Sequence, residues 1–318
     1  MPEVVAIGET MVLFSPVGDG PLRYIHLFEK RIGGAESNVC IGLARLGHAA
    51  GWVSRVGDDE FGRYVISAIR AEGVDVSQVK VDPQAPTAVY FKERRAFGGG
   101  AVYYYRKGSA ASRLSPEDLD PDYIRSARVL LGTGITPALS DSARETLWHA
   151  VKIAKEAGVT FVFDPNLRLK LWSPDEAKRT LLAFAREADV LLPGADEAEF
   201  LTGEADPLQA ARRLCALGPK TVIVKTGARG ALVVDGDEAY EVPGFPVERV
   251  VDPVGAGDAF AAGLIAGLLE GKSLEEAVLL ANACGAAATT VPGDIEGMPE
   301  REELDRIVSA KRGRDVMR

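Results

Sequence analysis

Short runs of β-branched and aliphatic residues recur along the chain, and amphipathic segments separate them. The clearest runs are residues 4–9, 51–57, 129–135, 159–166, 189–194 and 221–227. Strands that alternate with helices in this way form a parallel sheet, because each helix returns the chain across one face of the sheet. Val39 and Leu43 share one face of such a helical segment, which closes at Gly47. The sequence therefore predicts an α/β fold.

Composition and charge exclude several classes of protein. The 318 residues carry 37 Lys plus Arg and 46 Asp plus Glu, a formal net charge of -9. An acidic chain does not favour nucleic acid or an anionic membrane surface as a partner. Its apolar runs are too short to span a bilayer, and its first residues lack the basic start of a signal peptide. Cys40, Cys215 and Cys284 show no metal-binding or disulfide spacing. We therefore expect a cytoplasmic enzyme with reduced thiols.

Two stretches break the alternation, at roughly residues 10–30 and 86–106. The second contains TAVYFKERRAF and AVYYYRKG on either side of a glycine run, Gly98 to Gly100. Aromatic strands around a glycine-rich turn are typical of antiparallel hairpins. Because these stretches interrupt the strand and helix pattern and combine aromatic with basic residues, we interpret them as a small β lid over a cleft.

The run DPVGAGDAFAAGLIAGLL, residues 252–269, offers a site for chemistry. Small residues lead directly into an apolar helix, whose first turn presents unpaired N–H groups and a partial positive charge to an anion. Asp258 lies at the edge of this anion hole, where a carboxylate can take a proton from an attacking hydroxyl. The alternative is that Asp258 only caps the helix. The chain contains no GxxxxGK[ST] phosphate loop, so this loop would have to hold any phosphate.

Two motifs resemble the signatures of the PfkB sugar kinases. DPVGAGDAFAAGLI at 252–265 is similar to the second signature, and GGAESNVCIGLARLG at 33–47 is similar to the first, except that Cys40 replaces a usual Ser, Thr or Ala. The resemblance covers nearly the whole chain. It implies one ribokinase-like domain, residues 1–318, with three layers, a mainly parallel central sheet and the small lid.

The resemblance also assigns roles to residues that bind ATP and Mg²⁺. It implies that Asp258 is the catalytic base and that the residues before it form the anion hole, namely Gly255, Ala256 and Gly257. It places ATP against a second group of residues, namely Thr226, Gly227, Gly230, Gly257 and Asn282. Glu197 resembles the acid that organises water around magnesium, although Gly194 stands where the family has Asn. For Gly227 and Gly230, a hairpin turn is an equally good interpretation.

The lid segment carries the clue to the sugar. In a strand, Tyr104 and Arg106 point to the same face, and an Arg fork suits a carboxylate. A second cation, Arg168, follows another predicted strand, where ligand sites of α/β sheets lie. This arrangement resembles kinases of 2-keto-3-deoxygluconate, which phosphorylate its terminal primary hydroxyl. The resemblance assigns seven residues to the sugar: Gly34, Tyr90, Tyr104, Arg106, Arg168, Asp258 and Asp294.

Three other functions stay open at this point. A fructokinase would use Asp258 in the same way without needing the two arginines for an anion. A sugar-binding regulator could keep the fold without catalysis. A dinucleotide oxidoreductase would need GxGxxG after the first strand, which VVAIGETM lacks. The aromatic lid strand could also pair with the lid of another subunit, so we expect a homo-oligomer through the lid.

Overall fold

The computed structural model describes residues 1–95 and 100–316, and for residues 311–316 it describes the backbone alone. Gly98 and Gly99, part of the predicted turn of the lid, lie outside the described residues. The strands are β1 (Val4–Ile7), β2 (Met11–Pro16), β3 (Phe28–Gly33), β4 (Ala50–Gly57), β5 (Val79–Asp82), β6 (Val89–Glu93), β7 (Ala101–Tyr105), β8 (Val129–Thr133), β9 (Thr160–Asp164), β10 (Val190–Leu191), β11 (Thr221–Lys225), β12 (Gly230–Asp235) and β13 (Glu238–Pro243). The α-helices are α1 (Ala35–Arg45), α2 (Glu60–Ala71), α3 (Pro121–Arg125), α4 (Thr136–Leu139), α5 (Asp141–Ala157), α6 (Pro174–Glu187), α7 (Ala195–Thr202), α8 (Pro207–Cys215), α9 (Ala256–Leu269), α10 (Leu274–Ala288) and α11 (Arg301–Val316).

The larger sheet contains nine of the described strands, in the order β13-β12-β11-β10-β9-β8-β1-β4-β5. Strands from β11 through β5 pair in parallel, and the hairpin β12–β13 adds an antiparallel edge. All six runs predicted from the sequence are strands of this sheet. The chain order reverses between β1 and β8, and ligand sites of such sheets lie at the carboxyl ends of the strands near that reversal.

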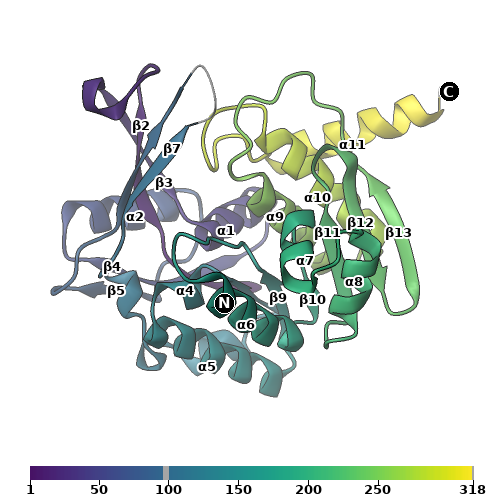
Figure 1. Ribbon diagram of the computed structural model, residues 1–318, viewed down its shortest axis with the longest axis horizontal. Helices are drawn as coiled ribbons and strands as arrows, with labels where there is room; N and C mark the ends of the chain where they lie inside the picture. Colours follow the sequence, from purple (N-terminus) through teal and green to yellow (C-terminus); the bar gives the residue numbers. More distant parts are fainter. Residues whose placement is uncertain (96–99, 317–318) are drawn as a thin grey trace.

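Two apolar layers cover the larger sheet, one on each face. Alternate residues of β1 enter different cores, because successive strand side chains point to opposite faces: Val4 and Ala6 to one, Val5 and Ile7 to the other. The first core contains side chains of α1, α9 and α10, and the second contains side chains of α5, α6 and α8. Figure 1 shows these helices on the two sides of the sheet. The predicted three-layer α/β fold is confirmed.

Close helix packing fixes the start of α9. Gly263 and Gly267 lie against α10, where a Cβ atom on Gly263 would come within 2.8 Å of the Cys284 sulfur and one on Gly267 within 2.7 Å of Ala277. The two helices therefore approach more closely than larger side chains would allow. Since α9 is buried along most of its length, its first turn is held rigidly at the edge of the sheet.

The small sheet has the strand order β3-β2-β6-β7 and stands apart from the larger one in Figure 1. It is formed by the two stretches predicted as the lid. The hairpins β2–β3 and β6–β7 are antiparallel as expected, but the central pair β2–β6 is parallel. The expectation of antiparallel strands throughout was therefore wrong for that pair, because β6 comes from a separate excursion of the chain and enters beside β2 in the same direction.

Candidate active site

A cavity of about 630 Å³ lies between the small sheet and the carboxyl ends of the central strands. Its walls include Glu9, which follows β1, and Asp164, at the end of β9. Lys225 enters from the end of β11, and Asp258 enters from the first turn of α9. The sheet reversal thus gathers charged side chains from distant parts of the sequence into one cavity, as α/β topology requires of a ligand site.

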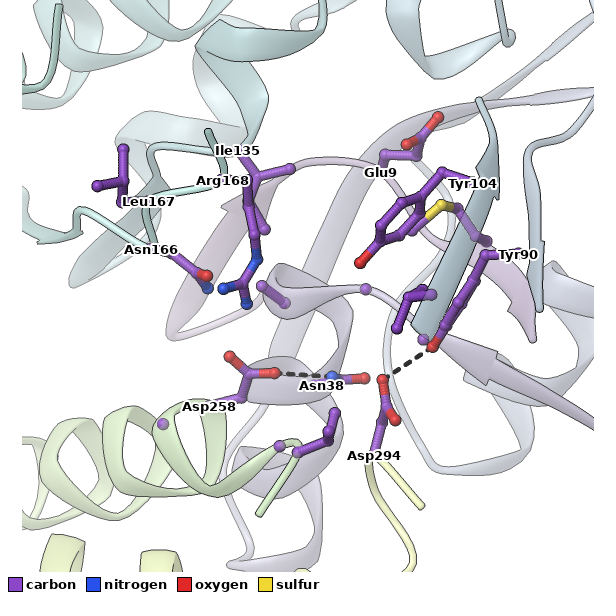
Figure 2. A pocket seen from close by; sticks show the side chains of 18 of the residues that line it. Glu9, Asn38, Tyr90, Tyr104, Ile135, Asn166, Leu167, Arg168, Asp258 and Asp294 are labelled. Carbon is purple, nitrogen blue, oxygen red and sulfur yellow. Dashed lines mark hydrogen bonds between the residues drawn. The ribbon is translucent and has the colours of Figure 1, made fainter. Parts of the chain in front are cut away.

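Asp258 is the third residue of α9 and does not cap it. The capping position belongs to Gly255, and no side chain caps the helix there. The carboxylate of Asp258 instead accepts a hydrogen bond from the Asn38 amide of α1, with Nδ2 and Oδ2 2.7 Å apart, as Figure 2 shows. The interpretation of Asp258 as a helix cap is therefore wrong, and its carboxylate is available to the cavity.

The surroundings of Asp258 raise the pKa of its carboxyl above the value it has in water. Burial raises the pKa of Asp258 to about 7, and the carboxylates of Asp164 and Asp294 act in the same direction. The hydrogen bond from Asn38 and the charge of Lys225 oppose that rise. A carboxyl whose pKa lies near neutrality can both accept and release a proton at the pH of a cell, which suits a general base.

Gly255 can adopt its conformation only as glycine. Its φ of +81° lies in the left-handed region, and a Cβ atom would come within 2.1 Å of the Asp294 carbonyl oxygen. Gly257 is more open, since the nearest atom to a Cβ there would be the Lys225 ammonium nitrogen at 3.7 Å. Uncapped N–H groups and an ammonium therefore lie together at the start of α9, the arrangement expected of an anion hole.

The structure brings every residue predicted to bind the sugar to the wall of this one cavity: Gly34, Tyr90, Tyr104, Arg106, Arg168, Asp258 and Asp294. Gly34 is the N-cap residue before α1, and Tyr90 and Tyr104 face each other across the β6–β7 pair with their ring centres 5.6 Å apart. Of the predicted anion hole, Gly255 and Gly257 line the cavity, whereas the side chain of Ala256 does not.

Arg106 reaches the cavity as part of a buried ion pair. Its Nε and a terminal nitrogen lie 2.7 and 2.6 Å from Oε2 of Glu9, and the two side chains are 9% and 1% exposed. Ser109 donates to the other oxygen of Glu9. Because Glu9 neutralises it, Arg106 brings less net charge to the cavity than the sequence predicts. Glu9 was not among the predicted site residues.

Arg168 presents its charge in a different way. It follows β9 in an exposed loop and lines the cavity, and no described side chain pairs with its guanidinium. In Figure 2 that guanidinium points toward the side of the cavity that holds Asp258 and Asn38. A cation without a carboxylate partner is the stronger candidate to attract an anionic group.

Asp294 is held by the small sheet. Tyr90 donates its hydroxyl to Oδ2 at 3.0 Å, and the Lys92 ammonium lies 2.7 Å from Oδ1. Both partners come from β6, whereas Asp294 lies in the loop that follows α10. The sugar-side wall is therefore fixed by contacts between the small sheet and a loop about two hundred residues further along the chain.

Of the residues predicted to bind the nucleotide, Gly257 lines the cavity and the other four form a group beside it. Thr226, Gly227, Gly230 and Asn282 are absent from its wall. Gly227 and Gly230 have φ of +64° and +107° and form the β11–β12 turn, where the Thr226 hydroxyl donates to the Gly230 carbonyl. Asn282 donates to the Val242 carbonyl at the neighbouring strand end. The turn interpretation of the two glycines is confirmed, and contact with a nucleotide stays a prediction.

Glu197 lines the cavity but is engaged by the backbone. One carboxylate oxygen accepts the Gly194 N–H and the other accepts the Leu167 N–H, each at 2.7 Å. Glu197 therefore caps α7 and also holds the loop that carries Arg168.

In the described residues, no group of three or more His, Cys, Asp or Glu side chains is arranged to hold a metal ion. Within that same part of the chain, none of the helices combines the length and apolarity needed to cross a bilayer.

Residues 1–301 match the family described as pfkB family carbohydrate kinase. The chain belongs to this family. Among its relatives, the 2-dehydro-3-deoxygluconokinases of Bacillus subtilis and Thermoproteus tenax are each 42% identical, over 98% of this chain and 96% and 95% of theirs. The probable fructokinase-7 of Arabidopsis thaliana is 36% identical over 97% of this chain and 93% of its own.

Solved structures of other family members agree with the fold. A PfkB protein from a Polaromonas species is 41% identical, with a TM-score of 0.88 over 96% of this chain and 99% of that one. A putative ribokinase II from E. coli, in complex with ATP and Mg²⁺, is 29% identical, with a TM-score of 0.91 over 98% of this chain and 100% of that one. This sugar kinase therefore has the ribokinase-like fold predicted from its sequence.

Several cavity residues of this sugar kinase were missed from the sequence. Asn38 lies inside the motif at 33–47, and its spacing of four residues from Gly34 could have placed it one helical turn away on the same face. Asp164 and Lys225 lie in predicted strand runs, end β9 and β11, and form an ion pair with a separation of 2.6 Å. Burial would lower the pKa of Lys225, but the carboxylates of Asp164 and Glu197 outweigh that effect and raise it, so Lys225 is charged.

Proposed function

We propose that this sugar kinase transfers the terminal phosphoryl group of ATP to 2-keto-3-deoxygluconate, which is also called 2-dehydro-3-deoxygluconate. The acceptor is the terminal primary hydroxyl of this sugar acid. The observation that carries the choice of sugar is the guanidinium of Arg168, which faces the cavity with no carboxylate partner among the described residues. The two relatives named for this activity, each 42% identical, support the same choice.

In the proposed mechanism, Asp258 acts as the general base. Its carboxylate would take the proton of the primary hydroxyl as that oxygen bonds to the terminal phosphorus of ATP and the bond from that phosphorus to ADP breaks. Asn38 holds the carboxylate in place. The N–H groups of residues 255–257 and the charge of Lys225 stabilise negative charge on the transferring group. Proton removal and charge stabilisation thus come from one helical turn and its immediate neighbour.

The donor side of the cavity fits a nucleotide with magnesium. ATP supplies the phosphoryl group, and Mg²⁺ neutralises charge on its phosphates. We propose that Thr226, Gly227, Gly230 and Asn282 line the nucleotide site. The turn of the first three directly follows Lys225, whose ammonium lies beside Gly257, and Asn282 donates to the Val242 carbonyl near that turn. The carboxylates of Asp164 and Glu197 lie in the cavity wall close enough to act on Lys225, and they favour a cation there. We propose that Glu197 contacts Mg²⁺ through water.

The acceptor side of the cavity offers two arginines, of which Arg106 is neutralised by a carboxylate and Arg168, among the described residues, is not. We propose that Arg168 supplies the net positive charge for the sugar carboxylate, while Arg106, Tyr104, Tyr90 and Gly34 fix its orientation. The pairing of Arg106 with Glu9 leaves the remaining guanidinium hydrogens free to donate. Asp294, held by Tyr90 and Lys92, is placed to accept from a sugar hydroxyl.

A fructokinase is the second candidate, and the ion pair of Arg106 with Glu9 favours it. Because Glu9 neutralises Arg106, only Arg168 remains as an unpaired arginine in the cavity wall among the described residues. A neutral sugar needs no cation to balance a carboxylate, so one unpaired arginine does not argue against it. The fructokinase relative at 36% identity also keeps this candidate open.

A panel of sugars in a coupled assay of ADP release tests the proposal. With ATP and Mg²⁺, we expect the highest kcat/KM for 2-keto-3-deoxygluconate. Higher catalytic efficiency with fructose would move the assignment to fructokinase and leave the family unchanged. No turnover of any sugar would instead favour a binding protein without catalysis.

We also propose that the kinase self-associates through β7 and acts in the cytoplasm. Strand β7 is an edge of the small sheet, and Tyr103 and Tyr105 on it are exposed. The free state of Cys40, Cys215 and Cys284 suits a reducing compartment. Light scattering of the protein and of a Tyr103→Asp, Tyr105→Asp variant tests the first point, since we expect the variant to have the smaller mass.

A further inference from the structure

Lys92 connects the small sheet to both loops beside the anion hole. It lies on β6, and its side chain is only 14% exposed. The ammonium nitrogen is 2.7 Å from Oδ1 of Asp294 and 3.7 Å from Oδ2 of Asp252. One cation of the small sheet therefore contacts two carboxylates from two different loops.

Those two loops form the support of Gly255. Asp252 accepts the Val254 N–H at 3.1 Å and the Gly293 N–H at 3.4 Å, so its carboxylate joins the two loops. The Asp294 carbonyl packs so closely on Gly255 that a Cβ atom there would clash. A shift of Asp252 or Asp294 would therefore move the first residue of the anion hole.

A second cation of the small sheet holds the same loop from outside the cavity. Arg31 of β3 donates to the Pro292 carbonyl at 2.7 Å and lies 3.2 Å from the Glu296 carboxylate. The loop from Pro292 to Glu296 is thus fixed at both ends by the small sheet, with Lys92 as the inner and more buried contact.

The charge of Lys92 also bears on Asp258. The groups facing Asp258 are Asn38 of α1, Tyr90 of β6, Asp164 of β9, Arg168 of the loop after β9, Lys225 of β11 and Asp294 of the loop after α10. Asp294 raises the pKa of Asp258, and Lys92 offsets the charge of Asp294. Loss of the ammonium would leave Asp252 and Asp294 without that cation and strengthen the repulsion felt by a charged Asp258.

We infer that Lys92 is a positioning residue for phosphoryl transfer, which couples the small sheet to the loops that shape the anion hole. The inference rests on the proposed assignment of residues 255–257 as that hole. Lys92 acts through Asp252 and Asp294 and does not serve as a sugar-binding cation, because two carboxylates already surround its charge. Because Lys92 belongs to the small sheet, the anion hole forms correctly only when that sheet is in this position.

Lys92→Met tests this role, since methionine keeps much of the apolar stem and removes the charge. We expect kcat to fall by about tenfold to a hundredfold, as misplaced reacting groups cause, while direct binding of the sugar falls by a smaller factor, because Tyr90 still holds Asp294. The acidic limb of the pH profile of kcat should move to higher pH. Lys92→Arg, which keeps the charge, should recover much of the loss.

Lys30→Met is the matched control. Lys30 lies on β3 of the same sheet, with its ammonium 3.9 Å from the centre of the Tyr64 ring and no contact to either loop. The Lys30→Met variant loses the same charge as Lys92→Met and should retain the kcat and the pH profile of the wild type. If Lys92→Met and Lys30→Met behave alike, or if Lys92→Met weakens sugar binding and leaves kcat intact, the inference is wrong.

Hydrogen exchange gives a measurement that does not depend on the substrate. Amides of residues 255–258 should exchange faster in Lys92→Met than in wild type or Lys30→Met, and unchanged exchange there would overturn the inference. Should wild type turn over no sugar, the proposed function fails and this measurement still decides the role of Lys92.

Asp252→Asn keeps an acceptor for Val254 and should also loosen these amides. If Lys92→Met does not fold, this variant carries the test. In a double-mutant cycle the two losses should not add.

Discussion

On the sugar side of the cavity, polar side chains are paired with one another before a ligand arrives, whereas the predicted nucleotide site beyond the Lys225–Asp164 pair consists mainly of turns and exposed apolar residues. Glu9 with Arg106, and Asp294 with Tyr90 and Lys92, are buried pairs. Beside the start of α9, in contrast, Val250, Val251 and Val254 are exposed. Fixed side chains can discriminate between hydroxyls and carboxylates, while a backbone turn with apolar neighbours suits a ligand common to many kinases.

The largest effect should come from the residue at the boundary of the two sides. Asp258→Asn is expected to lower kcat by about two to four orders of magnitude, the usual contribution of a positioned base. Sugar binding measured by calorimetry should persist, because the amide keeps the shape of the carboxylate. Since burial disfavours the charged carboxylate, the variant should melt no lower than wild type at pH 8. Near-normal turnover would remove Asp258 from the chemistry.

Arg106→Ala should damage the sugar side through stability as well as binding. The substitution leaves Glu9 buried without its cation, and breaking a buried pair from one side costs about 3–5 kcal/mol. We expect a clear loss in the free energy of unfolding measured by urea denaturation, partly recovered in Glu9→Gln, Arg106→Ala. A stability equal to wild type would show that Glu9 is not buried as a charge.

The pH profile should report the carboxyl of Asp258. Because its pKa is raised to about 7, the base is protonated at lower pH, and kcat/KM should fall by about tenfold per pH unit below that value. Asn38→Ala removes the hydrogen bond that favours the charged form and should move the limb to still higher pH. A flat profile down to pH 5 would contradict this assignment.

Arg168→Ala should affect the sugar acid and leave stability unchanged, in contrast to Arg106→Ala. The expected loss in binding is about 1.5–3 kcal/mol, typical of a hydrogen bond to a charged group. Calorimetry with 2-keto-3-deoxygluconate and with its carboxamide measures the selectivity. If the wild type binds both equally, the carboxylate is not recognised and the fructokinase candidate moves ahead.

The smallest effect is expected from Glu197→Gln. The change keeps one acceptor and should raise the Mg²⁺ concentration needed for half-maximal activity by several-fold, with little change in the KM for the sugar. Since Glu197 also holds the Leu167 N–H, a larger change in the sugar KM than in the Mg²⁺ requirement would show that it acts through the loop of Arg168 instead.

Local patterns in the sequence carried most of the fold and part of the site. Alternating strands and helices predicted the parallel sheet, and small residues before an apolar helix predicted the position of Asp258. The pairing of Arg106 with Glu9 was not predictable, because these residues are 97 positions apart and no local pattern links them. The same holds for Lys92 and Asp294, which are 202 positions apart. Such pairs depend on how the small sheet is placed against the rest of the fold.

The hydrogen bond between Tyr90 and Asp294 joins residues that are 204 positions apart, and this separation has a consequence for biosynthesis. Strands β1 to β11 leave the ribosome before α9, α10 and the loop that carries Asp294, so the apolar face that these helices cover stays open in the meantime. A nascent chain of that length has no complete cavity for a sugar to bind and stabilise. The substrate can therefore contribute to the stability of the fold only after Asp294 has been synthesised.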